Sequence, residues 1–302
     1  MCIKHSILWS FFISKLMILI VDSGSTKSDW IAVDSNGNQL FEKIRTKGLN
    51  PAILPEKKLF KIIKSSKELK KNRERVTHIF FYGAGCGTEN PKRLLEGVLQ
   101  EIFVNAQIDV NEDTLAAVYS TINTPTEAAV VCIMGTGSNC SYYDGEKLHQ
   151  RVNSLGYILM DDASGNYYGK QLIRDYYFNH MPVTVKHAFD TKFNLESDYI
   201  KYNVYKQPNA NAYLANFAEF MFLNKDSEYI VNLIKDGIRL FAKNMILQFK
   251  EELKYVPVHF AGSIAFFAQK EIKEVAEEMG FKVGNFQRRP IEGLIPYHTK
   301  DL

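Results

Sequence analysis

The chain has 302 residues, of which 46% are hydrophobic and 24% are charged, and its formal net charge is +3 at pH 7. This length favours two domains, and the composition is typical of a globular protein. So small a net charge argues against a nucleic acid or a membrane surface as partner. The four cysteines form neither a disulfide framework nor a CxxC pair, so we expect a reducing, cytoplasmic environment.

The start of the chain imitates a secretion signal, because charged residues precede the apolar residues 7–21. However, Lys15 interrupts the apolar run, and no small-x-small cleavage site follows it. A second methionine, Met17, stands directly before the first predicted strand. We therefore interpret residues 1–16 as an N-terminal extension ahead of the fold, with a targeting signal as the alternative.

The first half opens with three predicted antiparallel strands. Residues 18–21 are entirely apolar, which is typical of a buried central strand. Residues 29–33 alternate, and Asn36-Gly37 is a strong hairpin signal before residues 39–44. The segments expected next are a helix at 57–71, a strand at 76–82, a helix at 91–103, a strand at 107–110 and a helix from about Glu112.

The same order of elements restarts at residue 128. The apolar residues 128–134 precede a small-residue turn at 135–139, a strand at 140–143, an Asp144-Gly145 turn and a returning strand at 147–150. This internal repetition predicts two halves that are built alike. The later segments are expected to be helices at 171–178, 212–223 and 230–253, a strand at 256–260, a turn and helix at 262–279, a strand at 281–286 and a helix at 290–298.

A polar turn follows each of the two apolar strands that open the halves. In the first, Asp22 precedes a turn with one glycine, three hydroxyls and a lysine. Amides and hydroxyls of such a turn can wrap a terminal phosphate, Gly24 leaves the approach open, and Asp22 can hold Mg²⁺ through water. The alternative is an ordinary polar hairpin turn. The turn consists of Asp22, Ser23, Gly24, Ser25, Thr26 and Lys27.

The turn in the second half supports the phosphate interpretation. Two such turns at equivalent places of duplicated halves would face each other across a cleft and grip the β- and γ-phosphates of a nucleotide. Neither turn fits the P-loop pattern GxxxxGK[ST], and no dinucleotide fingerprint GxGxxG follows a strand. The second turn consists of Gly135, Thr136, Gly137, Ser138 and Asn139.

Three further segments suit a ligand cleft. Residues 83–87 place three glycines after a strand, which allows close approach of a ligand to the backbone. Asp113 stands in the first turn of a predicted helix, where it is either a catalytic acid or base or a favourable partner of the helix dipole. Gly262 and Ser263 join a strand to a helix, where adenine or ribose could lie on the backbone.

These motifs, in this order, resemble the superfamily of sugar kinases, actin and heat-shock-chaperone ATPases. Within it they are similar to the N-acetylglucosamine kinase branch, which also holds the ATPase subunits and activators of benzoyl-CoA reductase and related dehydratases. The resemblance implies an α/β fold of two duplicated ribonuclease-H-like domains facing across an ATP and sugar cleft. We expect these domains at residues 17–120 and 121–302, the second with a helical insert. The segments that carry the resemblance are residues 22–27, 83–87, 112–117, 135–140, 156–165 and 261–265.

The resemblance also implies roles for individual residues. Asp22 would work with Mg²⁺, Asp113 would be the catalytic base, and Asn50 would contact the sugar. Asp161 keeps the first acid of a Gly-Asp-Glu-Gly-Ser segment. The nucleotide is expected to contact Gly24, Ser25, Thr26, Lys27, Gly135, Thr136, Gly137, Ser138, Gly262 and Ser263. The sugar is expected to contact Asn50, Asn139, Gly156, Tyr157 and Asp161.

The acid segment departs from the family pattern. Met160 and Ala163 replace its two glycines, and Asp162 shortens its glutamate. Leu155 occupies a position where the kinases of this branch carry tryptophan. All of these changes fall near the expected sugar pocket, so they bear on the identity of the substrate more than on the use of ATP.

The favoured function is an ATP- and Mg²⁺-dependent kinase that converts N-acetylglucosamine to its 6-phosphate, with a homodimer compatible with the prediction. One alternative is the ATPase activator or subunit of a benzoyl-CoA-reductase or 2-hydroxyacyl-CoA-dehydratase system, which needs thiolates for an iron–sulfur cluster. Cys132 and Cys140 are instead expected to be buried core thiols. A second alternative is a catalytically silent sugar-binding regulator, supported only by the altered acid segment.

Overall fold

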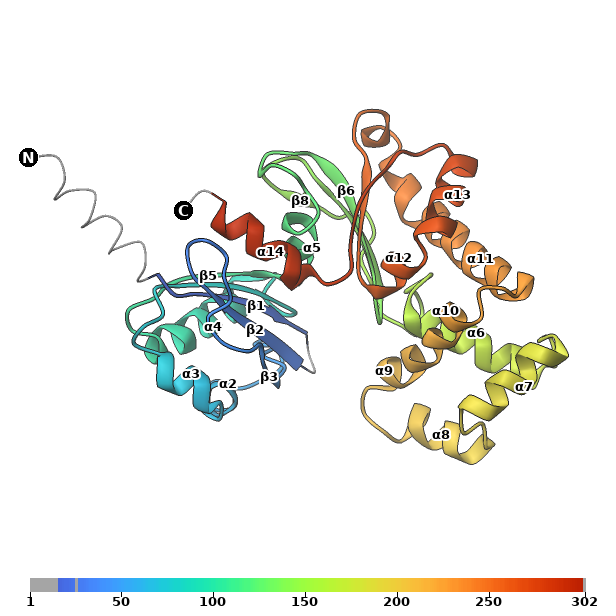
Figure 1. The fold of residues 1–302 in the computed structure, drawn as a ribbon, viewed down its shortest axis with the longest axis horizontal. Helices are drawn as coiled ribbons and strands as arrows, with labels where there is room; N and C mark the ends of the chain where they lie inside the picture. The colour runs from blue at the N-terminus through green and yellow to red at the C-terminus, as the bar shows by residue number, and fades with distance from the viewer. Residues whose placement is uncertain (1–15, 25–26, 301–302) are drawn as a thin grey trace, which may run out of the picture. The chain divides into compact units, whose positions relative to one another are not determined.

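The computed structural model describes residues 16–24 and 27–300 (Figure 1). The chain forms two compact units, one made of Met1–Ser120 with Pro290–Leu302 and the other of Thr121–Arg289. Apart from Leu16, the proposed N-terminal extension lies outside the described residues, so its interpretation stays a prediction. Across the described part of the chain, no helix is both long and apolar enough to span a bilayer.

The two units contain sheets of the same topology. In the first the strand order is β3-β2-β1-β4-β5, and in the second, read from the same side, it is β8-β7-β6-β9-β10. In each sheet the first two pairs are antiparallel and the last two pairs are parallel. The repetition predicted from the sequence is therefore a duplication of the whole sheet. The strands are β1 (Ile18–Ser23), β2 (Lys27–Val33), β3 (Ile44–Lys47), β4 (His78–Gly83), β5 (Gln107–Glu112), β6 (Ala129–Met134), β7 (Ser138–Tyr143), β8 (Leu148–His149), β9 (Val258–Ala261) and β10 (Val283–Gln287).

After β2 the chain turns at Asn36-Gly37 as expected, because the Gly37 amide donates to the Asp34 carbonyl oxygen and the Asp34 amide donates to the Asn38 carbonyl oxygen, both at 3.0 Å. The Asp34 carboxylate also accepts hydrogen bonds from the backbone N–H groups of Asn36 and Asn38. Gln39 then forms only an isolated bridge with Val33, and the paired strand begins at Ile44. The Asp34 side chain therefore reinforces a turn that the backbone itself closes.

Helices cover both faces of the first sheet. Leu19 and Val21 face a core completed by α2, α3 and α4, whereas Ile18 and Ile20 face α5 and α14, as the alternation of a strand requires. The single helix expected at residues 57–71 is divided, because the Ser66 hydroxyl accepts from the Leu69 amide and caps a second helix. The helices of this unit are α2 (Glu56–Lys64), α3 (Lys67–Asn72), α4 (Glu89–Ile102), α5 (Asp113–Tyr119) and α14 (Pro290–Thr299).

The last helix, α14, packs on the first unit, although the sequence-based boundary assigned it to the second. Ile291 and Leu294 are buried against the face of the sheet that carries Ile18 and Ile20. His298 stacks on Phe80 with ring centroids 3.7 Å apart, and its Nε2 lies 2.8 Å from the Tyr82 hydroxyl oxygen. Burial lowers the pKa of His298 to about 4, so the ring is neutral at physiological pH. The helix α14 thus helps to cover the apolar face of the sheet that carries Ile18 and Ile20.

The second unit is richer in helices. Aromatic side chains of its helices form the core, since Phe217, Phe220, Phe241 and Phe249 are buried in one cluster and the partly buried Phe222 packs against it. The helices α7 and α8 were not predicted, because α7 buries only Val185 and Phe189 and α8 buries no residue. The helices are α6 (Gly165–Tyr177), α7 (Val183–Lys192), α8 (Ser197–Tyr205), α9 (Ala210–Ala215), α10 (Glu219–Leu223), α11 (Glu228–Asn244), α12 (Ser263–Phe267) and α13 (Gln269–Met279).

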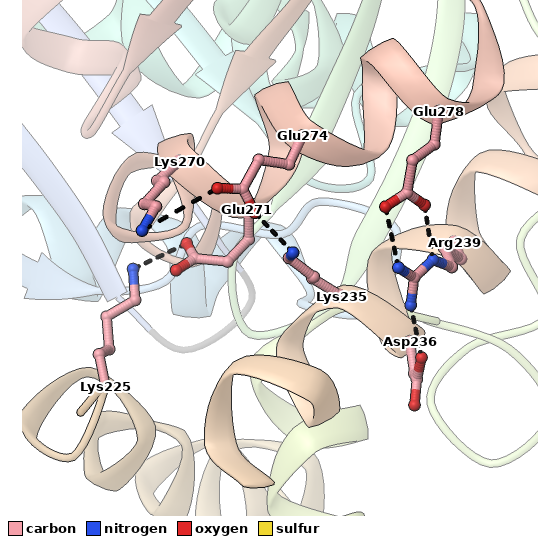
Figure 2. Close-up of polar contacts among 8 residues, drawn as sticks. All are labelled: Lys225, Lys235, Asp236, Arg239, Lys270, Glu271, Glu274 and Glu278. Atoms are coloured by element: carbon pink, nitrogen blue, oxygen red, sulfur yellow. Dashed lines mark hydrogen bonds and ion pairs between the residues drawn. The ribbon is translucent and has the colours of Figure 1, made fainter. Parts of the chain in front are cut away.

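Ion pairs fasten α13 to its neighbours in the second unit (Figure 2). Arg239 of α11 makes two hydrogen bonds to the Glu278 carboxylate, at 2.9 and 3.0 Å. Lys235 lies 2.6 Å from Glu274, and Lys225 lies 2.7 Å from Glu271, which is only 2% exposed. Because a buried carboxylate needs a partner, the Lys225 contact fixes the start of α13 directly after β9 and α12.

Two glycines provide a matched test of the packing. A Cβ at Gly169 in α6 would lie 1.9 Å from the Leu214 carbonyl oxygen of α9, whereas a Cβ at Gly97 in α4 would meet nothing within 4 Å. We therefore expect Gly169→Ala to destabilise the protein by about 1–3 kcal/mol, because the backbone must move. Gly97→Ala should stabilise it by about 0.5–1 kcal/mol, because alanine is the better helix former. Thermal unfolding measures both; equal effects would show that α6 and α9 are not in close contact.

Candidate functional site

The two predicted acids lie at the same end of the first sheet. Asp22 is near the end of β1, and Asp113 begins α5 directly after β5. Ser23 pairs with Gly83, and Gly83 pairs with Glu112, so the parallel strands end at one level. The pKa of Asp22 is raised to about 6, first by burial and then by the negative charge of Asp113. Burial also raises the pKa of Asp113, with a further contribution from Glu112.

The first turn is closed by its backbone. The Gly24 amide donates to the Lys27 carbonyl oxygen at 3.0 Å. Lys27 is exposed at the start of β2, and its positive charge partly offsets the rise in the pKa of Asp22. Ser25 and Thr26 lie outside the described residues, so their contacts with a phosphate stay predictions.

The Ser23 side chain stabilises the first turn by hydrogen bonds inside the protein. It is fully buried, its hydroxyl lies 2.6 Å from that of Ser28, and it accepts a hydrogen bond from the Leu49 amide at 3.1 Å. This hydroxyl is therefore used inside the protein. The contact with Leu49 also brings the neighbouring Asn50 to the end of β1.

The glycine loop after β4 lies against Asn50. Gly85 has a φ of +82°, and a Cβ there would lie 2.1 Å from the Asn50 Oδ1 atom. That oxygen accepts from the Ala52 amide at 3.0 Å, so the Asn50 side chain is held in place. A Cβ at Gly87 would lie 3.2 Å from the Glu112 Oε2 atom, next to Asp113. Glycine is thus required for close approach, and Asn50, Asp22 and Asp113 surround one end of the first sheet.

The second predicted turn is held by the start of α6. The Gly165 amide donates to the Gly135 carbonyl oxygen at 2.7 Å, and the Asn166 amide donates to the Thr136 carbonyl oxygen at 3.1 Å. These contacts satisfy helix N–H groups that have no partner within the helix. The Ser138 hydroxyl donates to the Asp162 carbonyl oxygen at 2.7 Å, so it braces the turn in the way that Ser23 braces the first.

Gly262 and Ser263 lie beside the second turn. Gly262 has a φ of +111°, and a Cβ there would lie 2.4 Å from the Met134 carbonyl oxygen and 3.1 Å from the Gly135 nitrogen. Only glycine permits this conformation and this approach. Ser263 follows as the exposed first residue of α12. The structure therefore brings the glycine after β9 together with the turn after β6.

Asp161 also touches the second turn. Its Oδ2 atom accepts from the Asn166 side chain at 3.0 Å, and a Cβ at Gly137 would lie 2.8 Å from the same oxygen. Asp162 turns to Asn244 instead, whose side chain donates to its Oδ2 atom at 2.9 Å. The departure at Ala163 has a visible consequence, since this residue has a φ of +56°, a region where an alanine costs about 1–2 kcal/mol.

Three further residues were predicted to contact the sugar, namely Asn139, Gly156 and Tyr157. Gly156 and Tyr157 lie in the loop before Asp161, which Lys170 of α6 secures by donating to the Tyr157 carbonyl oxygen at 2.5 Å. Asn139 lies in β7, and its Oδ1 atom accepts from the Cys140 amide at 2.8 Å. Leu155, at the expected tryptophan position, is 61% exposed. Sugar contacts by Asn139, Gly156 and Tyr157 therefore stay predictions.

The three cysteines among the described residues, Cys86, Cys132 and Cys140, have the environment of core residues. Cys132 and Cys140 face each other on β6 and β7, with their Sγ atoms 3.5 Å apart, and both are buried. Burial raises the pKa of the Cys132 thiol well above its ordinary value, and it raises that of Cys86 to about 12. The prediction that Cys132 and Cys140 are buried core thiols is confirmed.

The two acids at the end of the first sheet have the chemistry of ligands for a hydrated magnesium ion. Between residues 16 and 300, masked positions excepted, no group of three or more histidine, cysteine, aspartate or glutamate side chains could hold a metal. Asp22 and Asp113 form a pair of carboxylates whose pKa values rise because negative charge is crowded and desolvated there. Mg²⁺ commonly takes one or two carboxylates and keeps several waters, so this pair suits it.

Sequence reasoning missed Asn166, which contacts both the second turn and Asp161. It precedes the helix expected at 171–178, and an asparagine near the start of a helix ordinarily indicates only a cap. Its two partners lie 30 and 5 residues earlier in the chain. Their convergence on one side chain has no signature in the sequence.

The comparisons with known proteins agree with this geometry. No family model and no curated protein matches the sequence. Among solved structures, a candidate N-acetylglucosamine kinase from Porphyromonas gingivalis is 31% identical, with a TM-score of 0.86, and the match covers 94% of this chain and 99% of that one. A second candidate N-acetylglucosamine kinase, from Chromobacterium violaceum, is 14% identical with a TM-score of 0.69, over 93% of this chain and 98% of that one.

A Streptomyces griseus glucokinase of the ROK family, solved with glucose and AMPPNP, is 12% identical with a TM-score of 0.55, over 93% of this chain and 97% of that one. These last two similarities concern the fold, whereas the first extends to the sequence over nearly the whole of both chains. The chain therefore belongs to the N-acetylglucosamine kinase family, ATP-dependent sugar kinases with the duplicated actin-like ATPase fold.

Proposed function

We propose that this sugar kinase transfers the γ-phosphoryl group of ATP to the 6-hydroxyl of N-acetylglucosamine with the help of Mg²⁺. The observation that carries the proposal is the pair of partly desolvated carboxylates, Asp22 and Asp113, at the end of the first sheet. Similarity to the Porphyromonas gingivalis protein over nearly the whole chain supports the choice of sugar.

Asp113 is the proposed general base. As the sugar O6 attacks the γ-phosphorus, its proton passes to the Asp113 carboxylate, and the bond from phosphorus to the bridging β-oxygen breaks to release ADP. A raised pKa improves a carboxylate as a proton acceptor, because the most effective catalytic base has a pKa near the working pH. The short helix α5 fixes the position of this residue directly after β5.

Asp22 is the proposed residue that holds the metal. Mg²⁺ neutralises charge on the β- and γ-phosphates during phosphoryl transfer. Asp22 would orient its waters, because a carboxylate at the end of a buried strand is held more rigidly than one on a loop. The desolvation that raises the Asp22 pKa also makes the ionised carboxylate unfavourable in the folded protein, and a bound cation would offset this cost.

The two glycine turns are the proposed nucleotide contacts. Hydrogen bonds of the Ser23 and Ser138 hydroxyls fix the backbone of the turns before a ligand binds. Such preorganisation makes turn amides effective in binding phosphate. Asn50 and Asp161 are the proposed sugar contacts, together with Asn139, Gly156 and Tyr157. The proposed phosphate and ribose ligands are Gly24, Ser25, Thr26, Lys27, Gly135, Thr136, Gly137, Ser138, Gly262 and Ser263.

The alternatives are less well supported. A reductase activator needs cluster-forming thiolates, but Cys86, Cys132 and Cys140 are buried and packed. A silent regulator would have no use for two buried acids whose pKa values are raised, and Asp22 and Asp113 are such acids. The kinase accounts for both observations.

Substrate choice tests the proposal directly. Among N-acetylglucosamine, glucosamine, N-acetylmannosamine, N-acetylmuramic acid and glucose, we expect N-acetylglucosamine to give the highest kcat/KM, because Asn50 and Asp161 fall where this family contacts its sugar. ADP release measures the rate, and phosphorus NMR of the product identifies the phosphorylated hydroxyl. Release of ADP that is independent of every sugar would remove the kinase assignment.

Asp113→Asn separates catalysis from helix capping. Asparagine keeps the shape and can cap the helix, but it cannot accept the proton, so we expect kcat to fall by about 10²- to 10⁴-fold with ATP still bound. Glu56→Gln is the matched control, because Glu56 is an exposed acid in the first turn of α2. Its loss should leave kcat unchanged and cost about 0.3–1 kcal/mol of stability at most. Retention of most of the activity in Asp113→Asn would place the base elsewhere.

Asp22→Asn should abolish turnover and yet stabilise the protein at neutral pH. The folded-state pKa of Asp22 is about 6, above the ordinary value of 3.8, so ionising it opposes folding. This penalty is present above pH 6 and disappears as the pH falls below about 4. We therefore expect the variant to be more stable than the wild type by about 1–3 kcal/mol at pH 8, with the difference lost at pH 4.

Asp29→Asn, on the adjacent strand, is the opposite control. Burial alone would raise the pKa of Asp29, but its hydrogen bonds with Arg45 and the charges of Arg45 and Lys43 hold it below its usual value. Its ionised form therefore favours folding, and removing it should lower stability above about pH 4. Chemical denaturation from pH 4 to pH 8 measures both variants. If Asp22→Asn lost stability at pH 8, Asp22 would not be the desolvated acid described above.

A further inference from the structure

One buried side chain connects three parts of the second unit. Asn166 is the second residue of α6 and has no solvent exposure. Its side-chain Nδ2 donates to the Thr136 carbonyl oxygen at 2.6 Å and to the Asp161 Oδ2 atom at 3.0 Å. Its backbone amide donates to the same Thr136 oxygen at 3.1 Å. Asn166 therefore ties the second turn to the acid loop and to the start of α6.

These contacts fix the direction of two consecutive peptide groups. The carbonyls of Gly135 and Thr136 both point at the start of α6, where they accept from Gly165 and Asn166. In a trans peptide the N–H group points opposite to the C=O group, and the described chain has no cis peptide bond. The amides of Thr136 and Gly137 are therefore turned away from α6, side by side. Successive amides that point the same way form an anion-binding concavity.

The donor character of Asn166 is its distinguishing chemical property. The Oδ1 atom of Asn166 is buried without a hydrogen-bond partner among the described residues. An apolar side chain of similar size would fill the space without that unpaired acceptor, but it could not donate to Thr136 or Asp161. The close contact of Asp161 with Gly137 means that the acid, once held by Asn166, supports the turn from its other side.

We propose that Asn166 is a positioning residue that aims the amides of the second turn at the phosphates of ATP, with Asp161 as its partner. This inference rests on the proposed function, in which that turn binds phosphate. Asn166 acts through Thr136 and Asp161 and does not itself touch the nucleotide. Its loss should therefore weaken the binding of phosphates and leave the binding of the adenosine part unchanged.

Asn166→Ala in the full chain tests this, with Asn72→Ala as matched control. Asn72 is likewise buried, and its Nδ2 donates to one carbonyl and one carboxylate oxygen, both of Glu68 in α3 of the first unit. We expect Asn166→Ala to raise the Kd for ATP by about tenfold, the effect of losing one good hydrogen bond, without changing the Kd for adenosine. Asn72→Ala should change neither constant, although both variants lose thermal stability.

Asn166→Asp adds a readout that a packing role would not produce. At pH 8 it places a carboxylate against the Asp161 carboxylate and the Thr136 carbonyl, so ATP binding should weaken more than in Asn166→Ala. On acidification the introduced aspartate takes up a proton and again provides a donor, because a neighbouring carboxylate favours its neutral form. The Kd for ATP, relative to that of the wild type, should therefore fall on acidification in this variant and stay constant in Asn166→Ala.

The outcomes separate this inference from the proposed function. A wild-type protein that binds neither ATP nor ADP would overturn the proposed function and the inference with it. If the wild type binds ATP, the inference alone is overturned by an unchanged Kd in Asn166→Ala, by an equal loss of adenosine binding, or by the same loss in Asn72→Ala. A relative Kd for Asn166→Asp that does not depend on pH would also overturn it.

Discussion

The central strands β1 and β6 each have an antiparallel neighbour on one side and a parallel neighbour on the other. The positions of the candidate site residues depend on this arrangement. In each sheet the next strand along the chain is antiparallel, so a turn at the end of the central strand connects the two. A parallel neighbour ends at that same edge of the sheet, and its connecting loop begins there. Each sheet therefore places a hairpin turn next to the loops that follow its parallel strands. In the first unit this places Asp22 near Asp113, and in the second it places Gly135 beside Gly262.

Close packing at these edges has left little freedom for side chains. Gly85 is pressed against Asn50, Gly137 against Asp161 and Gly262 against Met134, and in each case a Cβ would overlap its neighbour. The hydroxyls of Ser23 and Ser138 are used to brace the turns. Some polar groups of the turns therefore hold the backbone, and others could contact a ligand. The hydroxyls of Ser23 and Ser138 belong to the first group.

Much of the fold could be read from the sequence, because apolar runs and turn residues act locally. The buried runs in β1 and β6, and the repetition of strand, turn and strand, all correspond to observed elements. The helices α7 and α8 could not be read, since they bury few side chains and so lack an apolar period. The division at Ser66 was missed because a serine cap and a solvent-facing serine look alike in the sequence.

The site was predictable as a set of motifs but not as a set of contacts. Asp22, Asp113 and the two turns were found because each follows a strand that could be recognised. The use of Asp161 to support Gly137, and of Asn166 to hold Asp161, could not be found, because both depend on loop conformations that include left-handed residues such as Asp161 itself. Ser25 and Thr26 lie outside the described residues, and their roles rest on the sequence alone.

The packing of α14 on the first unit has a consequence for how the protein is made. All of Thr121–Arg289 is synthesised between the body of the first unit and the helix that covers one face of its sheet. On the ribosome, Ile291 and Leu294 therefore reach this face of the sheet only after the entire second unit has been translated, and until then α5 is its only covering helix among the described residues. The nascent chain carries a partly uncovered hydrophobic surface throughout that interval, and the second unit can finish folding before the first one does.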